Sequence, residues 1–149
     1  MVYWRLPRLG SYKCNSDGAV KGVGGPSAWA FCIRNDEGNL IHAESFGLRI
    51  TSVLMSEAMA LRRGLEYCIM HHYLPVILET DSLMLQKILN GIWEVSWSSR
   101  VEVKRINGMR INVDARVEHI LREGNIFVQY ISSIQIFKCY HQKGKQYYT

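Results

Sequence analysis

Three carboxylic acids, Asp17, Glu57 and Asp81, stand where a folded chain could bring their side chains together. Asp17 closes a predicted strand and precedes a glycine, which lets another segment approach the backbone. Glu57 lies in the first turns of a predicted long helix, and Asp81 stands where a buried strand ends and a helix begins. Sites in α/β sheets form at such strand ends. If the two strands are neighbours, Asp17 and Asp81 project together and Glu57 reaches over them.

These acids could hold divalent metal ions. Three uncompensated carboxylates at one sheet edge repel one another strongly unless a cation lies among them. Ligand sets made of oxygen alone suit Mg²⁺ or Mn²⁺ rather than zinc. Two such ions about 4 Å apart can activate a water and stabilise the leaving oxygen in phosphodiester hydrolysis. Taken singly, Asp17 could instead be a turn residue, Asp81 a helix N-cap and Glu57 a helix-surface charge.

The hydrophobic pattern predicts the elements that must position these acids. SYKCNSD reads as a strand that ends at the Asp17-Gly18 turn, and SAWAFCIR and LIHAESFGL flank NDEGN as a hairpin. Residues 52–72 change to a helical period, LPVILET reads as a buried strand, and SLMLQKIL as a helix capped by Asp81 or Ser82. A helix over 98–112, a strand in ARVEHILRE and a final helix from Asn125 follow.

This order predicts an α/β fold: a three-strand antiparallel meander plus βα units, giving a mixed five-stranded sheet with helices on its faces. The 149 residues divide into an extended lead-in over 1–10, one domain over 11–137 and a basic flexible tail over 138–149. In the final helix, the apolar stripe is expected to comprise Val128, Ile131, Ile134 and Phe137.

Composition narrows the classes of protein. The sequence contains no apolar run of membrane-spanning length and no signal-peptide core, so we expect an intracellular protein of the nucleus or cytoplasm, not a secreted or membrane one. The four scattered cysteines fit reduced, mostly buried thiols better than disulfides or zinc ligands. The glycine-rich VKGVGGP lacks the ending of a phosphate-binding loop, and we expect no small-molecule cofactor. The net charge of +5 favours a polyanionic partner.

Read in order, YWRLPRLGSYKCNSDGA, GNLIHAESFGL, SEAMALRRGLEY, VILETDSLMLQKIL and VEHILREGN resemble the reverse-transcriptase-like ribonuclease H domains of plant genomes and retroelements, over about residues 4–134. The resemblance implies a ribonuclease H fold and a metal-dependent endonuclease that cleaves the RNA strand of RNA–DNA hybrids. It implies that Asp17, Glu57 and Asp81 bind Mg²⁺ or Mn²⁺, two ions in intact relatives. It also implies that His119 assists proton transfer or product release; alone, His119 reads equally well as a strand-end residue.

The family pattern carries a further acid ten residues beyond this histidine, where this chain has Gln129. A neutral, longer amide should weaken the nearest ion and leave one ion at the three acids. We therefore expect impaired hydrolysis, rescued better by Mn²⁺ than by Mg²⁺. A non-catalytic module that binds hybrid or RNA is the alternative, and a protein-interaction domain is a third reading.

Ribonuclease H folds bind phosphates and 2′-hydroxyls rather than base sequence. The expected nucleic-acid contacts are Asn15, Lys21, Arg49 and Ser56. Trp93 and Trp97 could either stack on nucleic acid or pack their loop onto the core.

Overall fold

The computed structural model describes residues 4–22, 25–48 and 51–146, with side chains up to residue 138. The strands are β1 (Tyr12–Val20), β2 (Ser27–Arg34), β3 (Leu40–Leu48), β4 (Val76–Thr80) and β5 (Ala115–His119). The helices are α1 (Val53–Met70), α2 (Leu83–Leu89), α3 (Arg100–Arg110) and α4 (Ile126–Gln146), with short 3-10 turns η1 (Trp97–Ser99) and η2 (Arg122–Asn125).

The strands form one mixed sheet in the order β3-β2-β1-β4-β5. β1, β2 and β3 pair antiparallel, whereas β4 lies parallel to both β1 and β5. The predicted meander and mixed five-stranded sheet are therefore confirmed. β1 and β4 are neighbours, so the segments that carry Asp17 and Asp81 end at the same edge of the sheet.

β1 is longer than predicted. It continues through Asp17 and Gly18 to Val20, and Asp17 pairs with Ala30 of β2. The predicted Asp-Gly turn is therefore wrong, because the cross-strand ladder to β2 overrides the turn preference of the dipeptide. The chain turns only after Val20, so Asp17 lies within a paired strand rather than in a loop.

Helix α1 lies close against β1. Its N-terminus is capped by Ser52, whose side chain accepts a hydrogen bond from the Met55 amide. A Cβ atom at residue 18 would overlap the backbone of Ser56 and Glu57, so glycine allows the first turn of α1 to touch the strand. One turn short of the helix end, a Cβ at Gly64 would come 2.5 Å from Cys14 Sγ. Two glycines thus set the spacing between helix and strand.

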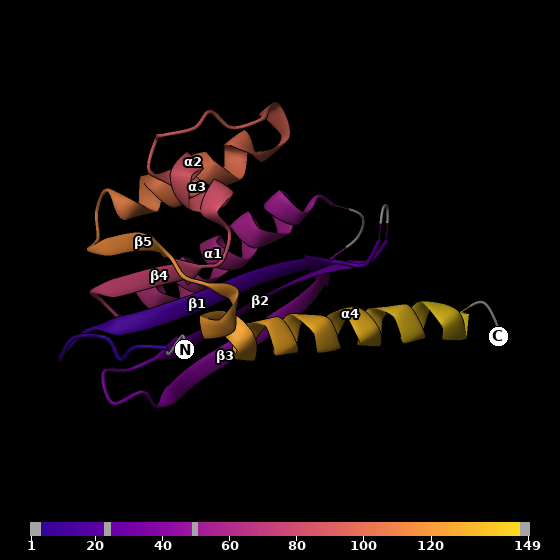
Figure 1. Cartoon of the computed structure of the whole chain (residues 1–149), viewed down its shortest axis with the longest axis horizontal. Helices are drawn as coiled ribbons and strands as arrows, with labels where there is room; N and C mark the ends of the chain where they lie inside the picture. Colours follow the sequence, from indigo (N-terminus) through magenta and orange to yellow (C-terminus); the bar gives the residue numbers. More distant parts are fainter. Residues whose placement is uncertain (1–3, 23–24, 49–50, 147–149) are drawn as a thin grey trace.

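The sheet separates two layers of helices (Figure 1). The main core lies between the sheet and α1, α2 and α3, and contains Phe31, Leu65 and Leu78. On the opposite face α4 packs alone, with Val128 against Ala30 and Cys32 of β2. Cys14, Cys32 and Cys68 are buried and free, as expected, while the Cys139 side chain lies outside the described residues.

Helix α4 differs from its prediction in two ways. Its buried side is formed by Val128, Ser132 and Ile136, whereas Ile134 and Phe137 are exposed, so the predicted stripe is wrong beyond Ile131. The helix is rotated about its axis so that Ser132 faces the sheet, where its hydroxyl bonds to Asp17. The helix also crosses residue 137, where the domain was expected to end, and continues to Gln146. Residues 138–146 are therefore part of a helix.

Residues 4–10, which we name the N-terminal strap, are fastened to the α4 side of the sheet. The Trp4 indole donates to Asn15 Oδ1 at 3.2 Å and to Glu79 Oε1 at 3.0 Å. Buried Lys13 forms an ion pair with Glu79 at 3.2 Å and donates to the Arg5 carbonyl at 2.8 Å. Removing one partner from such a buried network leaves the others unsatisfied. The strap is therefore an integral layer of the fold.

No helix within the described ranges is long and apolar enough to cross a membrane.

The close contact between α1 and β1 predicts opposite effects for two helical glycines. Gly64→Ala should destabilise the protein by about 1–3 kcal/mol, because the new methyl overlaps Cys14 Sγ. Gly108→Ala, in open space on α3, should instead stabilise it by about 1 kcal/mol. Urea denaturation followed by circular dichroism measures both. Equal effects of the two substitutions would contradict this account of the α1–β1 contact.

Candidate functional site

A pocket of about 430 Å³ opens at the edge where β1 and β4 end. Asp17 enters it from β1, Glu57 from the first turns of α1 and Asp81 from the residue after β4. Arg122 and Gln129 line the same pocket. The three acids singled out from the sequence are therefore brought to one place, and their charges interact there.

Burial dominates the electrostatics of Asp17. Loss of hydration raises the pKa of Asp17 from 3.8 to about 6, and the negative charge of Asp81 adds to the rise. A hydrogen bond with Ser132, at 2.7 Å between Oγ and Oδ2, opposes it. The same Oγ lies 3.0 Å from the Gln129 carbonyl oxygen. One hydroxyl proton serves one acceptor at a time, so it can bond Gln129 when Asp17 is protonated and Asp17 when it is ionised.

Burial also dominates the electrostatics of Glu57. Burial raises the pKa of Glu57 from 4.5 to about 7, helped by the charges of Asp81 and Asp17. A side-chain hydrogen bond with Ser82 opposes this rise. The Ser82 oxygen also accepts the Leu85 amide at 3.1 Å, which caps α2. Ser82, rather than Asp81, is therefore the cap, and it links the start of α2 to Glu57.

Gln129 is bonded to an acid of the pocket. Its amide nitrogen donates to Asp81 Oδ2 at 2.9 Å and to the Arg122 carbonyl at 3.0 Å. Both partners are acceptors, so the NH₂ group must face them. Gln129 therefore affects the pocket in two ways. It adds no carboxylate, and its amide nitrogen is hydrogen-bonded to an oxygen of Asp81.

The pocket has the kind of side chains that a divalent cation prefers, but these side chains are not arranged as a metal site. Its acids offer only oxygen donors, and the raised pKa values of Asp17 and Glu57 show that their charges lack compensation. However, within the part of the chain that the structure describes, no three His, Cys, Asp or Glu side chains are grouped so that they could hold a metal ion. Each acid is instead directed to a protein donor: Ser132, Ser82 or Gln129.

Two residues beside the acids need comment. His119 pairs with Thr80 at the end of β5, and its Nε2 lies 3.2 Å from the Asp81 carbonyl, to which it donates. It thus contacts the backbone of Asp81 without lining the pocket. Arg122, which sequence reasoning missed, does line the pocket, and its positive charge lowers the pKa of both Asp17 and Glu57. Its place within the LREGN motif was the available signal.

The structure places the four expected nucleic-acid contacts differently. Asn15 is 4% exposed, and its amide donates to Glu79 and Asn125. Ser56 is fully buried and donates to the Val53 carbonyl. Neither side chain faces solvent, which corrects the expectation for both, because each satisfies its polar atoms inside the fold. Lys21 is exposed beside the glycine-rich loop. Arg49 lies outside the described residues.

Comparisons with known proteins agree on the fold. The family model described as reverse transcriptase-like matches residues 15–134. The RNase H1 of the halophilic archaeon Halobacterium salinarum superposes with a TM-score of 0.80 at 20% identity, covering 86% of this chain and 98% of that one. LC11-RNase H1, solved in complex with an RNA/DNA hybrid, superposes with a TM-score of 0.80 at 22% identity, covering 87% and 99%.

The N-terminal RNase H domain of a Mycobacterium tuberculosis protein gives a TM-score of 0.82 at 12% identity, covering 89% of this chain and 98% of that chain. No match was found among curated protein sequences. At these identities the solved structures establish a shared RNase H fold.

The raised pKa values predict how stability changes with pH. Between pH 4 and about 7 the folded protein keeps protons on Asp17 and Glu57 that the unfolded chain has released. Without divalent metal, the free energy of unfolding should therefore fall as the pH rises through this window. Asp17→Asn should stabilise the protein by up to about 3 kcal/mol at pH 8, because a shift of about two pKa units is removed, and by almost nothing at pH 4.

Thermal and urea unfolding in EDTA at pH 4 and pH 8 measure this difference. Glu94→Gln is the matched control, because Glu94 is exposed and lies outside the pocket. An equal effect of Asp17→Asn at both pH values would show that the carboxylate of Asp17 carries no burial penalty.

Proposed function

This chain belongs to the reverse transcriptase-like family, and from that membership we propose that it is a metal-dependent endonuclease that hydrolyses the RNA strand of RNA–DNA hybrids. One observation carries the proposal. Asp17, Glu57 and Asp81 come from three separate elements and face a single pocket at the sheet edge. Burying several acids together lowers the stability of the fold unless a bound ligand neutralises their charge. The raised pKa values of Asp17 and Glu57 are typical of functional sites. A neighbour of the same fold was solved with an RNA/DNA hybrid, which supports the substrate class.

Asp17, Glu57 and Asp81 would hold Mg²⁺ or Mn²⁺, which supplies an activated water and neutralises charge on the leaving oxygen. For this, each carboxylate must turn from its present protein donor. Ser132 can release Asp17 at little cost, because its hydroxyl has the Gln129 carbonyl as a second acceptor. His119 already contacts the Asp81 backbone and would need to turn its ring from that carbonyl to take part in proton transfer.

Gln129 weakens this site in two ways. It adds no negative charge at the fourth position, and its amide nitrogen occupies Asp81 Oδ2. A metal ion at Asp81 therefore competes with this hydrogen bond, while a second hydrogen bond, to the Arg122 carbonyl, holds the Gln129 amide in place. We infer that the pocket binds one metal ion rather than two, and that hydrolysis is slow in Mg²⁺. Mn²⁺ should support it better because it tolerates looser geometry.

The Gln129–Asp81 hydrogen bond also favours a second candidate, a module that binds hybrid without cleaving it. Such a module would use the same fold with the acids kept on protein donors. The two candidates differ in a single measurable property, which is whether the RNA strand is cut.

Substrate contacts are proposed for the segment between α2 and α3. Trp97 is 82% exposed, and the Arg100 guanidinium lies 5.5 Å from its ring centre. Lys87 lies 4.9 Å from the ring centre of Trp93. Neither tryptophan belongs to the core, so the packing role considered from sequence has no support here. An aromatic face beside a cation suits a nucleic-acid strand, which offers bases for stacking and phosphates for the charge.

Cleavage of a labelled RNA strand in an RNA–DNA hybrid tests the function. We expect slow cleavage by the natural chain in Mg²⁺, faster cleavage in Mn²⁺, and none by Asp81→Asn. Gln129→Asp should raise the Mg²⁺ rate at least roughly tenfold, equivalent to about 1.4 kcal/mol in the barrier. Gln129→Leu, which frees Asp81 without adding charge, separates loss of the amide bond from gain of a ligand.

Fast Mg²⁺-dependent turnover that Gln129→Asp leaves unchanged would refute the proposed impairment. Hybrid binding with no cleavage by any variant in either metal would assign the chain to the binding-module class instead.

Phosphate contacts predict a strong effect of salt on hybrid affinity and little effect of base sequence. Fluorescence anisotropy with labelled hybrid across a potassium chloride series measures the slope. Lys87→Gln and Arg100→Gln should each reduce that slope by about 1, while Arg63→Gln, on α1 and paired with Glu66, should not. A slope unaffected by Lys87 and Arg100 would exclude this segment as a phosphate contact.

A further inference from the structure

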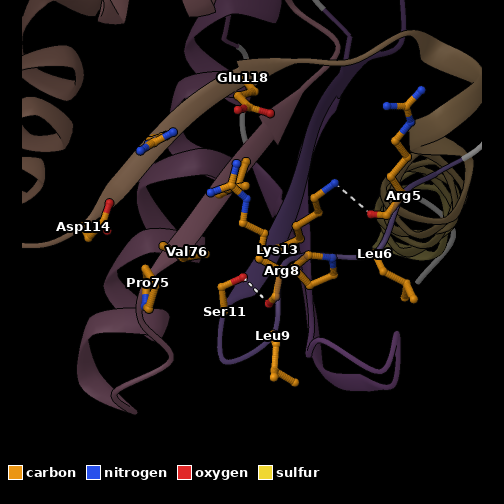
Figure 2. A pocket seen from close by; sticks show the side chains of 13 residues that line it. Arg5, Leu6, Arg8, Leu9, Ser11, Lys13, Pro75, Val76, Asp114 and Glu118 are labelled. Carbon is orange, nitrogen blue, oxygen red and sulfur yellow. Dashed lines mark hydrogen bonds between the residues drawn. The ribbon is translucent and has the colours of Figure 1, made fainter.

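A second pocket, of about 390 Å³, lies far from the acids, at the beginnings of the parallel strands. We name it the strap pocket, because its lining includes residues 5–9 of the N-terminal strap. Its lining includes Lys13 near the start of β1, and Pro75 and Val76 where β4 begins (Figure 2). Arg116 of β5 also lines it. Asp17 and Asp81 stand at the opposite ends of these strands.

The lining of the strap pocket includes three arginines. Arg5 and Arg8 belong to the strap and Arg116 to β5. Among the described residues, none of these guanidinium groups forms an ion pair, whereas Lys13 in the same lining is paired with Glu79. Figure 2 shows that the Arg5 side chain extends away from Arg8, so the positive charge open to an anion in this hollow comes from Arg8 and Arg116. Asp114 and Glu118 of the same lining carry negative charge.

The backbone below these arginines is fixed in advance. The Arg5 carbonyl accepts a hydrogen bond from buried Lys13 at 2.8 Å. The Arg8 carbonyl accepts both the Ser11 hydroxyl at 2.6 Å and the Ser11 amide at 3.0 Å. Figure 2 shows the two side-chain bonds, which hold the strap over the sheet. Fixed backbone positions lower the entropy lost when flexible arginine side chains bind a ligand.

The other lining residues restrict the kind of ligand that the pocket could bind. Pro75 and Val76 give the pocket an apolar side, which suits a flat or hydrophobic group. Asp114 and Glu118 line the β5 side and offer acceptors for hydroxyl or amino groups. The volume lies in the range of about 300–1,000 Å³ that is usual for small-molecule sites. The pocket is therefore larger than a phosphate ion needs and combines cationic, apolar and accepting surfaces.

We propose that the strap pocket binds the terminal phosphate monoester of a nucleotide, with Arg8 and Arg116 at the phosphate. A phosphate monoester carries nearly two negative charges at neutral pH, and arginine binds its oxygens in bidentate fashion. The sugar and base lie against the apolar side, within reach of Asp114 and Glu118. The same chemistry is presented by a free nucleoside monophosphate and by the 5′-phosphorylated end of a strand. This site is independent of the acids at the other end of the sheet.

Titration calorimetry of the full chain in EDTA tests the proposal, with adenosine 5′-monophosphate, adenosine and inorganic phosphate as probes. Adenosine 5′-monophosphate should bind with a Kd on the order of 0.1–1 mM. Inorganic phosphate should bind at least about tenfold more weakly, and adenosine should not bind. Arg8→Gln and Arg116→Gln should each weaken nucleotide binding about tenfold. Both residues are exposed, so circular dichroism should report an unchanged fold.

Two control variants locate the ligand. Glu118→Gln removes a negative charge from the same pocket and should preserve or tighten binding, and Asp81→Asn at the distant acids should leave it unchanged. Affinity that is insensitive to Arg8 and Arg116, or equal affinity for inorganic phosphate and nucleotide, would overturn the proposal. Absence of saturable binding would overturn it as well.

A 5′-phosphorylated trinucleotide, compared with its 5′-hydroxyl form, identifies the source. Equal affinity of the phosphorylated trinucleotide and the free nucleotide would assign the pocket to a strand end. Binding of the free nucleotide alone would assign it to a mononucleotide. Either result supports the phosphate monoester site.

Discussion

The short distance between helix α1 and strand β1 is the constraint on which the site depends. Gly18 has no side chain, so the first turn of α1 rests on the backbone of β1, and Gly64 leaves room further along the helix for the Cys14 side chain. That contact brings Glu57 into the pocket that also contains Asp17, the residue before Gly18 on β1. A wider spacing would separate the two carboxylates, and the parallel pairing of β1 with β4 alone would then place only Asp17 and Asp81 together.

Two neighbouring groups of buried charges on the sheet are compensated to different degrees. Lys13 of β1 and Glu79 of β4 neutralise each other, and Asn15 and Trp4 satisfy the remaining polar atoms. At the edge where β1 and β4 end, Asp17 and Glu57 are buried with Arg122 as the nearby cation, and burial raises their pKa. The first arrangement holds the fold together, whereas the second leaves negative charge that a ligand can use. Gln129 is intermediate, because it satisfies Asp81 without neutralising it.

Much of this architecture could be predicted from sequence. Alternating and helical periods revealed the strands and helices, and the order of elements led to the mixed sheet. The adjacency of β1 and β4, which was a condition of the sequence-based prediction, comes from the structure. Local propensity failed where tertiary contacts compete with it. Asp17-Gly18 has the composition of a turn but pairs with β2, and Ser132 displaces Ile134 from the buried side of α4 because Asp17 needs its hydroxyl. The burial of Asn15 and Ser56 could not be foreseen from their positions, because Asn15 bonds to Asn125 far along the chain and Ser56 turns back to the Val53 carbonyl inside the packed first turn of α1. The amide orientation of Gln129 depends on two acceptors from other elements, which no spacing rule reveals.

The bonds of Trp4 also bear on how such a domain is joined to other protein segments. If a linker were attached directly at residue 11, the indole would be lost, and Glu79 and Asn15 would face an opened hydrophobic surface. Water could then reach the Lys13–Glu79 pair, and β1 and β4 would lose the cover that the strap gives them on this face. A fusion or excision boundary must therefore lie upstream of Trp4, and the autonomous unit of folding includes a segment with no regular secondary structure.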